Sequence, residues 1–199
     1  MIAVLTGDII NSKDHKAAKW LPILKQGLAR YGNAPLDWEL YRGDSFQLKT
    51  HPETALEAAI YLKASLKQIR HLDVRIAIGL GEQDHHADKI TESNGTAFVN
   101  SGECFENLKK QTLALQSGNA LFDDTLNLMF QLANLTMDNW LPATAKIVKA
   151  SMEHPEANQK ELTTLVDKSQ STISEALLRA GFDEVQKMIH FYRTQLARL

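Results

Sequence analysis

YRGDSFQL, residues 41–48, lies between two short runs of strand-forming residues, 38–41 and 46–48. Gly43-Asp44 is a typical turn pair, so the stretch predicts a β-hairpin with Asp44 at its tip. A hairpin in the middle of the chain favours an α+β sheet with helices on one face. In a doubly wound parallel sheet, helices would connect the strands instead. This stretch therefore decides the fold class.

Strands and helices alternate on either side of the hairpin. Apolar runs predict strands at 2–5, 74–78 and 113–116, with Thr6-Gly7-Asp8 as the turn after the first. Helical spacing predicts helices at 16–31, 52–71, 96–110 and 121–137, the first kinked or shortened at Pro22. The order β-α-β-β-α-β-α-β-α predicts a ferredoxin-like α+β domain over residues 1–138.

Composition and the N-terminal sequence indicate the cellular compartment in which the protein is expected. The single cysteine, Cys104, excludes an internal disulfide and a Cys-based zinc cluster. The N-terminal MIAVLTGDII lacks a basic region, and no apolar run of 18 residues occurs, which predicts neither a signal peptide nor a membrane span. We expect a cytoplasmic protein. On these grounds an extracellular adhesion role for Arg42-Gly43-Asp44 is not expected.

Two aspartates are candidate metal ligands. Asp8 closes the predicted first strand and Asp44 lies at the hairpin tip, so adjacent strands would bring the carboxylates together. Two close carboxylates repel unless a cation lies between them, and Mg²⁺ favours carboxylates combined with substrate phosphates. The alternative is that both are ordinary turn or cap residues.

Four segments resemble known families. VLTGDIINS, RGDSF, VRIAIGLGE and GTAFVN are similar, in the same order, to metal- and ribose-binding segments of class III nucleotidyl cyclases. RGDSF also resembles the GGDEF motif of diguanylate cyclases. The combination with a helical tail resembles the SatD family. The resemblance implies Mg²⁺ at Asp8 and Asp44, and a purine nucleotide near Arg42, Gly43 and Asn100.

The sequence departs from the cyclase pattern at three positions. Leu40 stands where a base-reading lysine is usual, and Cys104 where a transition-state arginine is usual. Ser45 replaces the second acid of the GGDEF pattern. These departures predict a domain that binds a ligand without efficient turnover. The His85-His86 loop is expected to be solvated.

The residues after the first domain are expected to be helical. Strand signals stop near 138–142, so we expect an all-α domain over residues 142–199. Asn158 and Glu161 form a capping box, with Leu162 and Leu165 inward on the helix that follows. After a short turn, Ser169 can cap a second helix with Ile173, Leu177 and Leu178 on its apolar face. This plan is typical of a helix-turn-helix, and KELTTLVDKSQSTISEALLRAG resembles bacterial regulators of that class. The residues expected to face DNA are Ser169, Gln170, Ser171, Thr172 and Ser174.

The charge balance of the tail and the apolar stripe of its last helix leave alternatives to DNA binding open. From Pro155 onward six Lys/Arg balance six Asp/Glu, which predicts weak DNA binding unless two copies pair. An apolar stripe could support a homodimer or pack on the helix-turn-helix; it comprises Val185, Ile189, Tyr192 and Leu196. The preferred hypothesis is a transcription regulator with a cyclase-like sensor domain. The alternatives are an active nucleotidyl cyclase or nucleotidyltransferase whose tail serves dimerisation, and a structural dimer.

Overall fold

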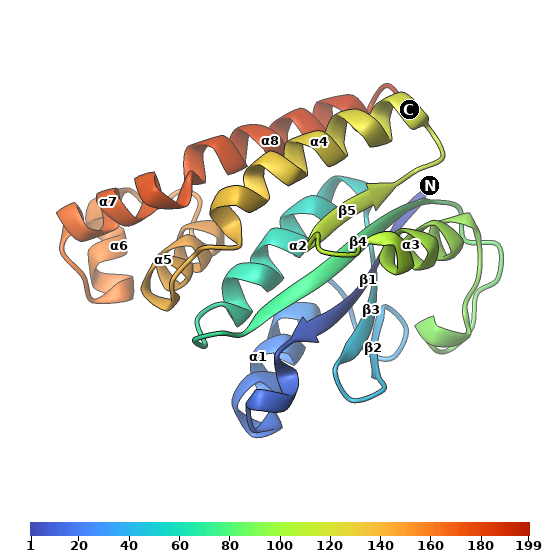
Figure 1. Cartoon of the computed structure of the whole chain (residues 1–199), viewed down its shortest axis with the longest axis horizontal. Coiled ribbons are helices and arrows are strands. Elements are labelled where there is room, and N and C mark those ends of the chain that lie inside the picture. Colours follow the sequence, from blue (N-terminus) through green and yellow to red (C-terminus); the bar gives the residue numbers. More distant parts are fainter.

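The centre of the molecule is a five-stranded mixed sheet. The computed structural model describes residues 1–199 and gives the α+β class expected from the hairpin (Figure 1). In spatial order the strands are β2 (Trp38–Tyr41), β3 (Ser45–Thr50), β1 (Ile2–Ile10), β4 (Asp73–Gly81) and β5 (Leu113–Gln116). Neighbours are antiparallel except β4 and β5, which are parallel.

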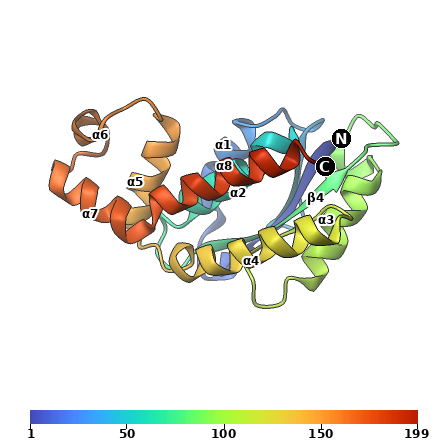
Figure 2. The same cartoon turned by 90° about the horizontal axis from the view of Figure 1, so that it is seen from above.

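The helices cover both faces of the sheet, so the expectation of helices on one face alone is wrong (Figures 1 and 2). Two short 3₁₀ helices span Ser12–Asp14 and Ile90–Glu92. The α-helices are α1 (Ala17–Ala29), α2 (Pro52–Leu66), α3 (Thr96–Asn107), α4 (Ala120–Met137), α5 (Pro142–Glu153), α6 (Gln159–Val166), α7 (Gln170–Ala180) and α8 (Phe182–Leu196). The main core lies between the sheet and α1, α2 and α4, with α8 packed on α2 and α4. α3 covers part of the opposite face, against β1, β4 and β5. No helix combines the length and apolar character that a membrane crossing requires.

The first strand is longer than predicted. Thr6-Gly7-Asp8 is not a turn but part of β1, which pairs with β3 and β4 through Asp8 and beyond. The reason lies at Gly7, where a Cβ atom would come 2.5 Å from Phe46 Cζ and 2.7 Å from the Arg75 carbonyl oxygen. Gly7 therefore permits close packing within the sheet. In the sequence alone, the same Gly-Asp pair looks like the start of a turn.

The hairpin prediction is confirmed. β2 and β3 pair up to Tyr41 and Ser45, and residues 42–44 connect them. Arg42 (φ 52°) and Gly43 (φ 93°) both adopt the left-handed region that such a tight connection requires. Asp44 therefore leaves the turn directly into β3, beside β1.

The two faces of β1 have different neighbours. Its odd-numbered residues enter the main core, among them Ala3, Leu5 and Ile9. The even-numbered residues face α3, whose Ser101 hydroxyl lies 3.0 Å from the Thr6 hydroxyl. Asp8 and its β4 partner Arg75 follow on the same face, close to the end of β1. Both remain partly exposed to solvent.

The helical tail shares the main core. α5 and α8 contribute buried residues to the cluster that contains the sheet, so the transition near 138–142 is a change of secondary structure rather than a gap in packing. The apolar stripe of α8 is buried within the chain, and the Tyr192 hydroxyl donates to the Pro52 carbonyl at 2.7 Å. The expectation that this stripe pairs two copies is therefore wrong; α8 packs on α2 and α4 and also contacts α7, in the segment expected to form the helix-turn-helix. A second, smaller core joins α5, α6 and α7; it contains Ile147, Ala150, Leu162, Val166, Ile173 and Ala176.

A buried charge network ties the sheet to the start of the tail. Lys63 of α2, 4% exposed, bonds Asp73 Oδ1 at 2.8 Å and Asp138 Oδ1 at 2.7 Å. Lys67 bonds Asp73 Oδ2 at 2.9 Å and the Asp138 carbonyl oxygen at 2.7 Å. Thr112 donates to Asp138 at 2.6 Å. The junction of α4 and α5 is thus held to α2, β4 and the start of β5.

Candidate functional site

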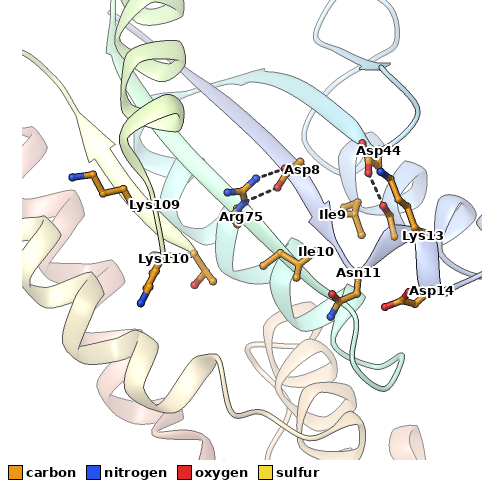
Figure 3. A pocket seen from close by; sticks show the side chains of 12 residues that line it. Asp8, Ile9, Ile10, Asn11, Lys13, Asp14, Asp44, Arg75, Lys109 and Lys110 are labelled. Atoms are coloured by element: carbon orange, nitrogen blue, oxygen red, sulfur yellow. Dashed lines mark hydrogen bonds and ion pairs between the residues drawn. The ribbon is translucent and has the colours of Figure 1, made fainter.

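A polar cleft lies at the carboxyl end of β1 (Figure 3). Its volume is about 570 Å³, and ten of its twelve lining residues are polar or charged. They come from β1 and the turn after it, from the hairpin tip, from β4 and from the connection between α3 and β5. The lining residues are Asp8, Ile9, Ile10, Asn11, Ser12, Lys13, Asp14, Asp44, Arg75, Lys109, Lys110 and Thr112. Both predicted metal aspartates therefore line the same cleft.

Asp8 is held by an arginine on the adjacent strand. Arg75 Nε donates to Asp8 Oδ1 at 2.9 Å, and Arg75 Nη2 donates to Asp8 Oδ2 at 2.5 Å (Figure 3). The hydrogen bonds to Asp8 raise the pKa of Arg75 further above its ordinary value. The guanidinium also lies over the Phe105 ring, 5.4 Å from its centroid. The Asp8 charge is thus already balanced by a fixed, bidentate cation.

Asp44 is attached to the end of β1. Its carboxylate Oδ2 accepts a hydrogen bond from the Ser12 hydroxyl at 2.5 Å, and its carbonyl oxygen accepts from the Ile9 backbone amide at 3.1 Å. The left-handed Asn11 (φ 61°) turns the chain so that Ser12 can reach the hairpin. Figure 3 shows Asp8 turned toward Arg75 and Asp44 on the other side of Ile9.

The carboxylates as arranged do not fit a directly bound Mg²⁺ ion. No group of three or more His, Cys, Asp or Glu side chains could hold a metal. Both Asp8 carboxylate oxygens accept hydrogen bonds from Arg75. A metal cation placed in the plane of the carboxylate would be repelled by the positive charge of the guanidinium. A divalent ion at Asp8 requires that Arg75 first move away.

The same cleft has a basic side that sequence reasoning missed. Lys13, Lys109 and Lys110 are exposed, and none of them forms an ion pair. Three free ammonium groups around a cleft of this size favour an anion such as phosphate. The sequence does mark Arg75 as a candidate site residue, because it is a charged residue within the apolar run VRIAIG.

The predicted nucleotide residues lie elsewhere. Arg42 and Gly43 are exposed at the hairpin tip and do not line the cleft. Asn100 donates to the Leu80 carbonyl oxygen at 2.7 Å and accepts from Gln116 at 3.3 Å. Leu80 lies five residues along β4 from Arg75, roughly 16 Å at the rise of a strand. The structure does not bring Asn100 together with the aspartates.

Two other sequence features do not form sites. Cys104 packs on α3 against Ala77, Leu108 and Ala114, and burial raises the pKa of its thiol to about 12. It is a packing residue. In the His85-His86 loop both histidines are exposed, and the His85 amide donates to the Asn94 carbonyl oxygen at 3.0 Å.

The second candidate surface is the α6–turn–α7 segment. Asn158 Oδ1 accepts from the Glu161 amide at 3.0 Å, and Glu161 Oε2 accepts from the Asn158 amide at 2.9 Å, which confirms the capping box. Asp167 (φ 54°) makes the left-handed turn that ends α6. Ser169 Oγ then accepts from the Thr172 amide at 3.2 Å, which confirms the cap of α7.

The first turn of α7 presents polar side chains to solvent. All five predicted DNA-facing residues, Ser169–Thr172 and Ser174, are exposed. The Ser169 hydroxyl also lies 3.0 Å from the Ser171 hydroxyl and 2.9 Å from the Thr172 hydroxyl. Gln170 and Ser174 side chains form no hydrogen bond within the chain. This surface can therefore donate to and accept from an external partner.

The apolar faces of these helices differ from the prediction. Leu178 is 83% exposed and Leu165 is 50% exposed, so neither lies on the inner face. Val166 takes the inward place expected of Leu165. Leu162 and Ile173 are buried as predicted and Leu177 is partly buried, while α7 also buries Ala176 and Ala180. The small alanines allow close contact with α5 and the rest of the tail.

Comparisons of the chain with protein-family models, with curated proteins and with solved structures find no match. Function is therefore inferred from the geometry of the cleft and of the α6–turn–α7 surface.

Proposed function

We propose that this chain is a transcription regulator that binds DNA through α6 and α7, arranged as a helix-turn-helix. The observation that carries the proposal is the capped, solvent-exposed N-terminal turn of α7, which follows a tight left-handed turn. In a helix-turn-helix the second helix enters the major groove and its first residues contact base edges. Gln170, Ser171 and Thr172 occupy that place.

The packing of the tail supports this role. α5, α6 and α7 have a small core of their own, which fixes the inner face of α7 while its outer face stays exposed. Figures 1 and 2 place α6 and α7 at one end of the molecule, away from the sheet. A duplex could reach the first turn of α7 there without meeting the sheet or α3.

Charge sets the expected strength of binding. The tail is neutral from Pro155 onward, with six basic and six acidic residues, so phosphate contacts are few. Lys168 lies in the turn between the two helices, is exposed, and has no acidic partner. It is the cation best placed to meet a backbone phosphate as α7 enters the groove, and the N-terminus of α7 adds a partial positive charge.

The test is a salt titration of duplex binding by fluorescence anisotropy, with wild type, Lys168→Ala and Lys25→Ala. We expect wild-type affinity for a mixed-sequence duplex of about 30 base pairs to fall steeply with salt, and Lys168→Ala to reduce the salt slope by about 1. Lys25 is also an exposed lysine but lies on α1, so Lys25→Ala should match the wild type. Equal slopes for all three proteins, or no duplex binding at low salt, would refute the proposal.

We further propose that the front domain is a ferredoxin-like sensor related to the nucleotidyl cyclases. The specific support is the strand order β2-β3-β1-β4 with every pair antiparallel, together with Asp8 and Asp44 in one cleft. Lys13, Lys109 and Lys110 would contact the phosphates of a nucleotide. Phosphate could also attract Arg75, which would release Asp8 for Mg²⁺. The buried thiol at Cys104 supplies no cation for turnover, so the proposal is for binding.

The cleft proposal is tested by calorimetric titration of Mn²⁺ into wild type, Arg75→Ala and the Asp8→Asn/Arg75→Ala double variant. Because Arg75 occupies both Asp8 oxygens, Arg75→Ala should bind Mn²⁺ about 10-fold more tightly than the wild type. The double variant should lose that gain, since the freed carboxylate is gone. Identical titrations for the three proteins would show that Asp8 holds no cation.

A further inference from the structure

A second lobe continues the polar cleft past the end of β1. It has a volume of about 540 Å³ and lies between the loop after α2, the start of β4 and the junction of α4 and α5. Ile10, Asn11 and Thr112 line both the cleft and this lobe, so the two form one groove; Ile10 and Asn11 are labelled in Figure 3. The groove has room for a ligand that extends well beyond its phosphate groups.

Hydrogen bonds fix the place where the cleft and the second lobe meet. The Asn11 side-chain amide donates to the His71 carbonyl oxygen at 2.8 Å, which holds the loop after α2 against the end of β1. Just before β5, the Thr112 hydroxyl donates to Asp138 Oδ1 at 2.6 Å. Two of the three shared residues are therefore bonded directly to walls of the second lobe.

The second lobe is less polar than the cleft. Five of its fourteen lining residues are hydrophobic, against two of twelve in the cleft. Leu141 is 70% exposed and Ile69 is half-buried, so both present apolar surface to a ligand. The Arg70 guanidinium forms no hydrogen bond within the chain, and Asn139 bonds only through its Nδ2, which leaves Oδ1 free to accept. Apolar surface beside a free donor and a free acceptor matches a nucleobase, which has apolar faces and a polar edge.

The unpaired charge along the groove is mostly positive. The lysines and arginines without an acidic partner are Lys13, Arg70, Lys109 and Lys110, and the acidic residues without a basic partner are Asp14 and Asp44. The other carboxylates of the groove are neutralised by Lys63, Lys67 and Arg75. All three unpaired lysines line the cleft, so the anionic end of a ligand belongs there and its less polar end belongs in the second lobe.

We infer that the groove binds a nucleotide whose base and ribose lie in the second lobe, against Arg70 and Leu141. The inference rests on the proposal above that the cleft lysines contact phosphates, and it adds the residues that recognise the nucleoside. The Arg70 guanidinium can stack on the face of the base or donate to its edge, and Leu141 supplies apolar contact. A sugar phosphate or inorganic phosphate has no flat apolar group to fill this lobe.

A nucleoside in the second lobe also reaches the tail. Leu141 directly precedes α5, and Pro142 begins it. α5 supplies Ile147 and Ala150 to the small core that holds α6 and α7. The nucleoside would therefore contact the helix on which the α6–turn–α7 segment packs.

Calorimetric titration with ATP, GTP and inorganic tripolyphosphate in a magnesium buffer separates the two lobes, because tripolyphosphate has no nucleoside. The wild type should bind at least one of the nucleotides about 10-fold more tightly than tripolyphosphate, since the nucleoside buries apolar surface. Arg70→Ala/Leu141→Ala should remove that difference and leave tripolyphosphate binding within about 2-fold of the wild type, because Arg70 lies outside the cleft and salt screens its charge.

Two further variants are the controls. Lys109→Ala/Lys110→Ala should weaken binding of the nucleotide and of tripolyphosphate alike. Leu178→Ala, at an 83% exposed leucine on α7, is matched to Leu141 and should bind as the wild type does; circular dichroism checks the folding of each variant. Equal affinity of the wild type for tripolyphosphate and both nucleotides would overturn the inference and leave phosphate binding in the cleft intact. No binding of any of the three would overturn both.

Photolabelling with an azidopurine triphosphate locates the base. After irradiation, digestion and mass spectrometry, the label should lie in residues 69–72 or 139–142, and excess unlabelled nucleotide should prevent its attachment. Label confined to the hairpin tip at 42–43, or to the peptide that contains Asn100, would contradict the inference.

Discussion

Arg75 determines what Asp8 can do. The sequence shows an aspartate at the end of an apolar run, which predicts a metal ligand. The register of β1 and β4 pairs Asp8 with Arg75, and both carboxylate oxygens are thereby occupied. Strand register depends on contacts between distant segments, so the nearest neighbour of Asp8 could not be read from the local motif.

Two glycines make a matched test of the packing of α3 on the sheet. At Gly79 of β4 a Cβ atom would come 2.2 Å from both the Ala97 carbonyl oxygen and the Ser101 amide nitrogen, which are backbone atoms. Gly79→Ala should therefore lower the free energy of unfolding by about 2–3 kcal/mol. At Gly102 of α3 no atom lies within 4 Å, so Gly102→Ala should raise it by about 0.5–1 kcal/mol through helix propensity.

Urea unfolding of the two variants and the wild type gives the comparison. The two changes add the same methyl group within one pair of packed elements, so opposite signs can be attributed to the contact at Gly79. Equal and small effects would mean that α3 does not lie against β4 as closely as described.

Among the helices and strands, sequence motifs predict structure correctly where the interactions that form it lie within a few residues of each other. The hairpin at 42–44, the capping box at Asn158 and the cap at Ser169 were all predicted and are present. Each depends on hydrogen bonds or backbone angles within a few residues. The class α+β followed from these elements and their order.

The faces of the tail helices were less predictable. The expected inner positions Leu165 and Leu178 are exposed, whereas Val166 and Ala180 are buried. Apolar residues on both sides of a helix leave its orientation undetermined until the neighbouring elements are known. The exposed leucines of α4 present the same ambiguity, which the fold resolves by burying the face of Phe122 and Phe130.

For the whole molecule, the transition near 138–142 marks a change from mixed to helical structure while the core continues. α8 returns along α2 and α4, and Trp140 at the junction donates to the Ala180 carbonyl oxygen at 3.1 Å. The buried pairs of Lys63 and Lys67 with Asp73 add to this joint. The sequence offered lysines on a predicted helix, and only the tertiary fold shows that they are buried. A ligand in the cleft would touch Thr112, which belongs to the same network.

The central claim is that the first turn of α7 meets DNA. Hydrogen–deuterium exchange of the full chain, with and without a duplex at low salt, measures this most directly because it locates the contact along the chain. We predict that DNA slows exchange in residues 168–176, while the cleft around Asp8 and the sheet are unchanged. Protection confined to the cleft or to α4, with residues 168–176 unaffected, would contradict it.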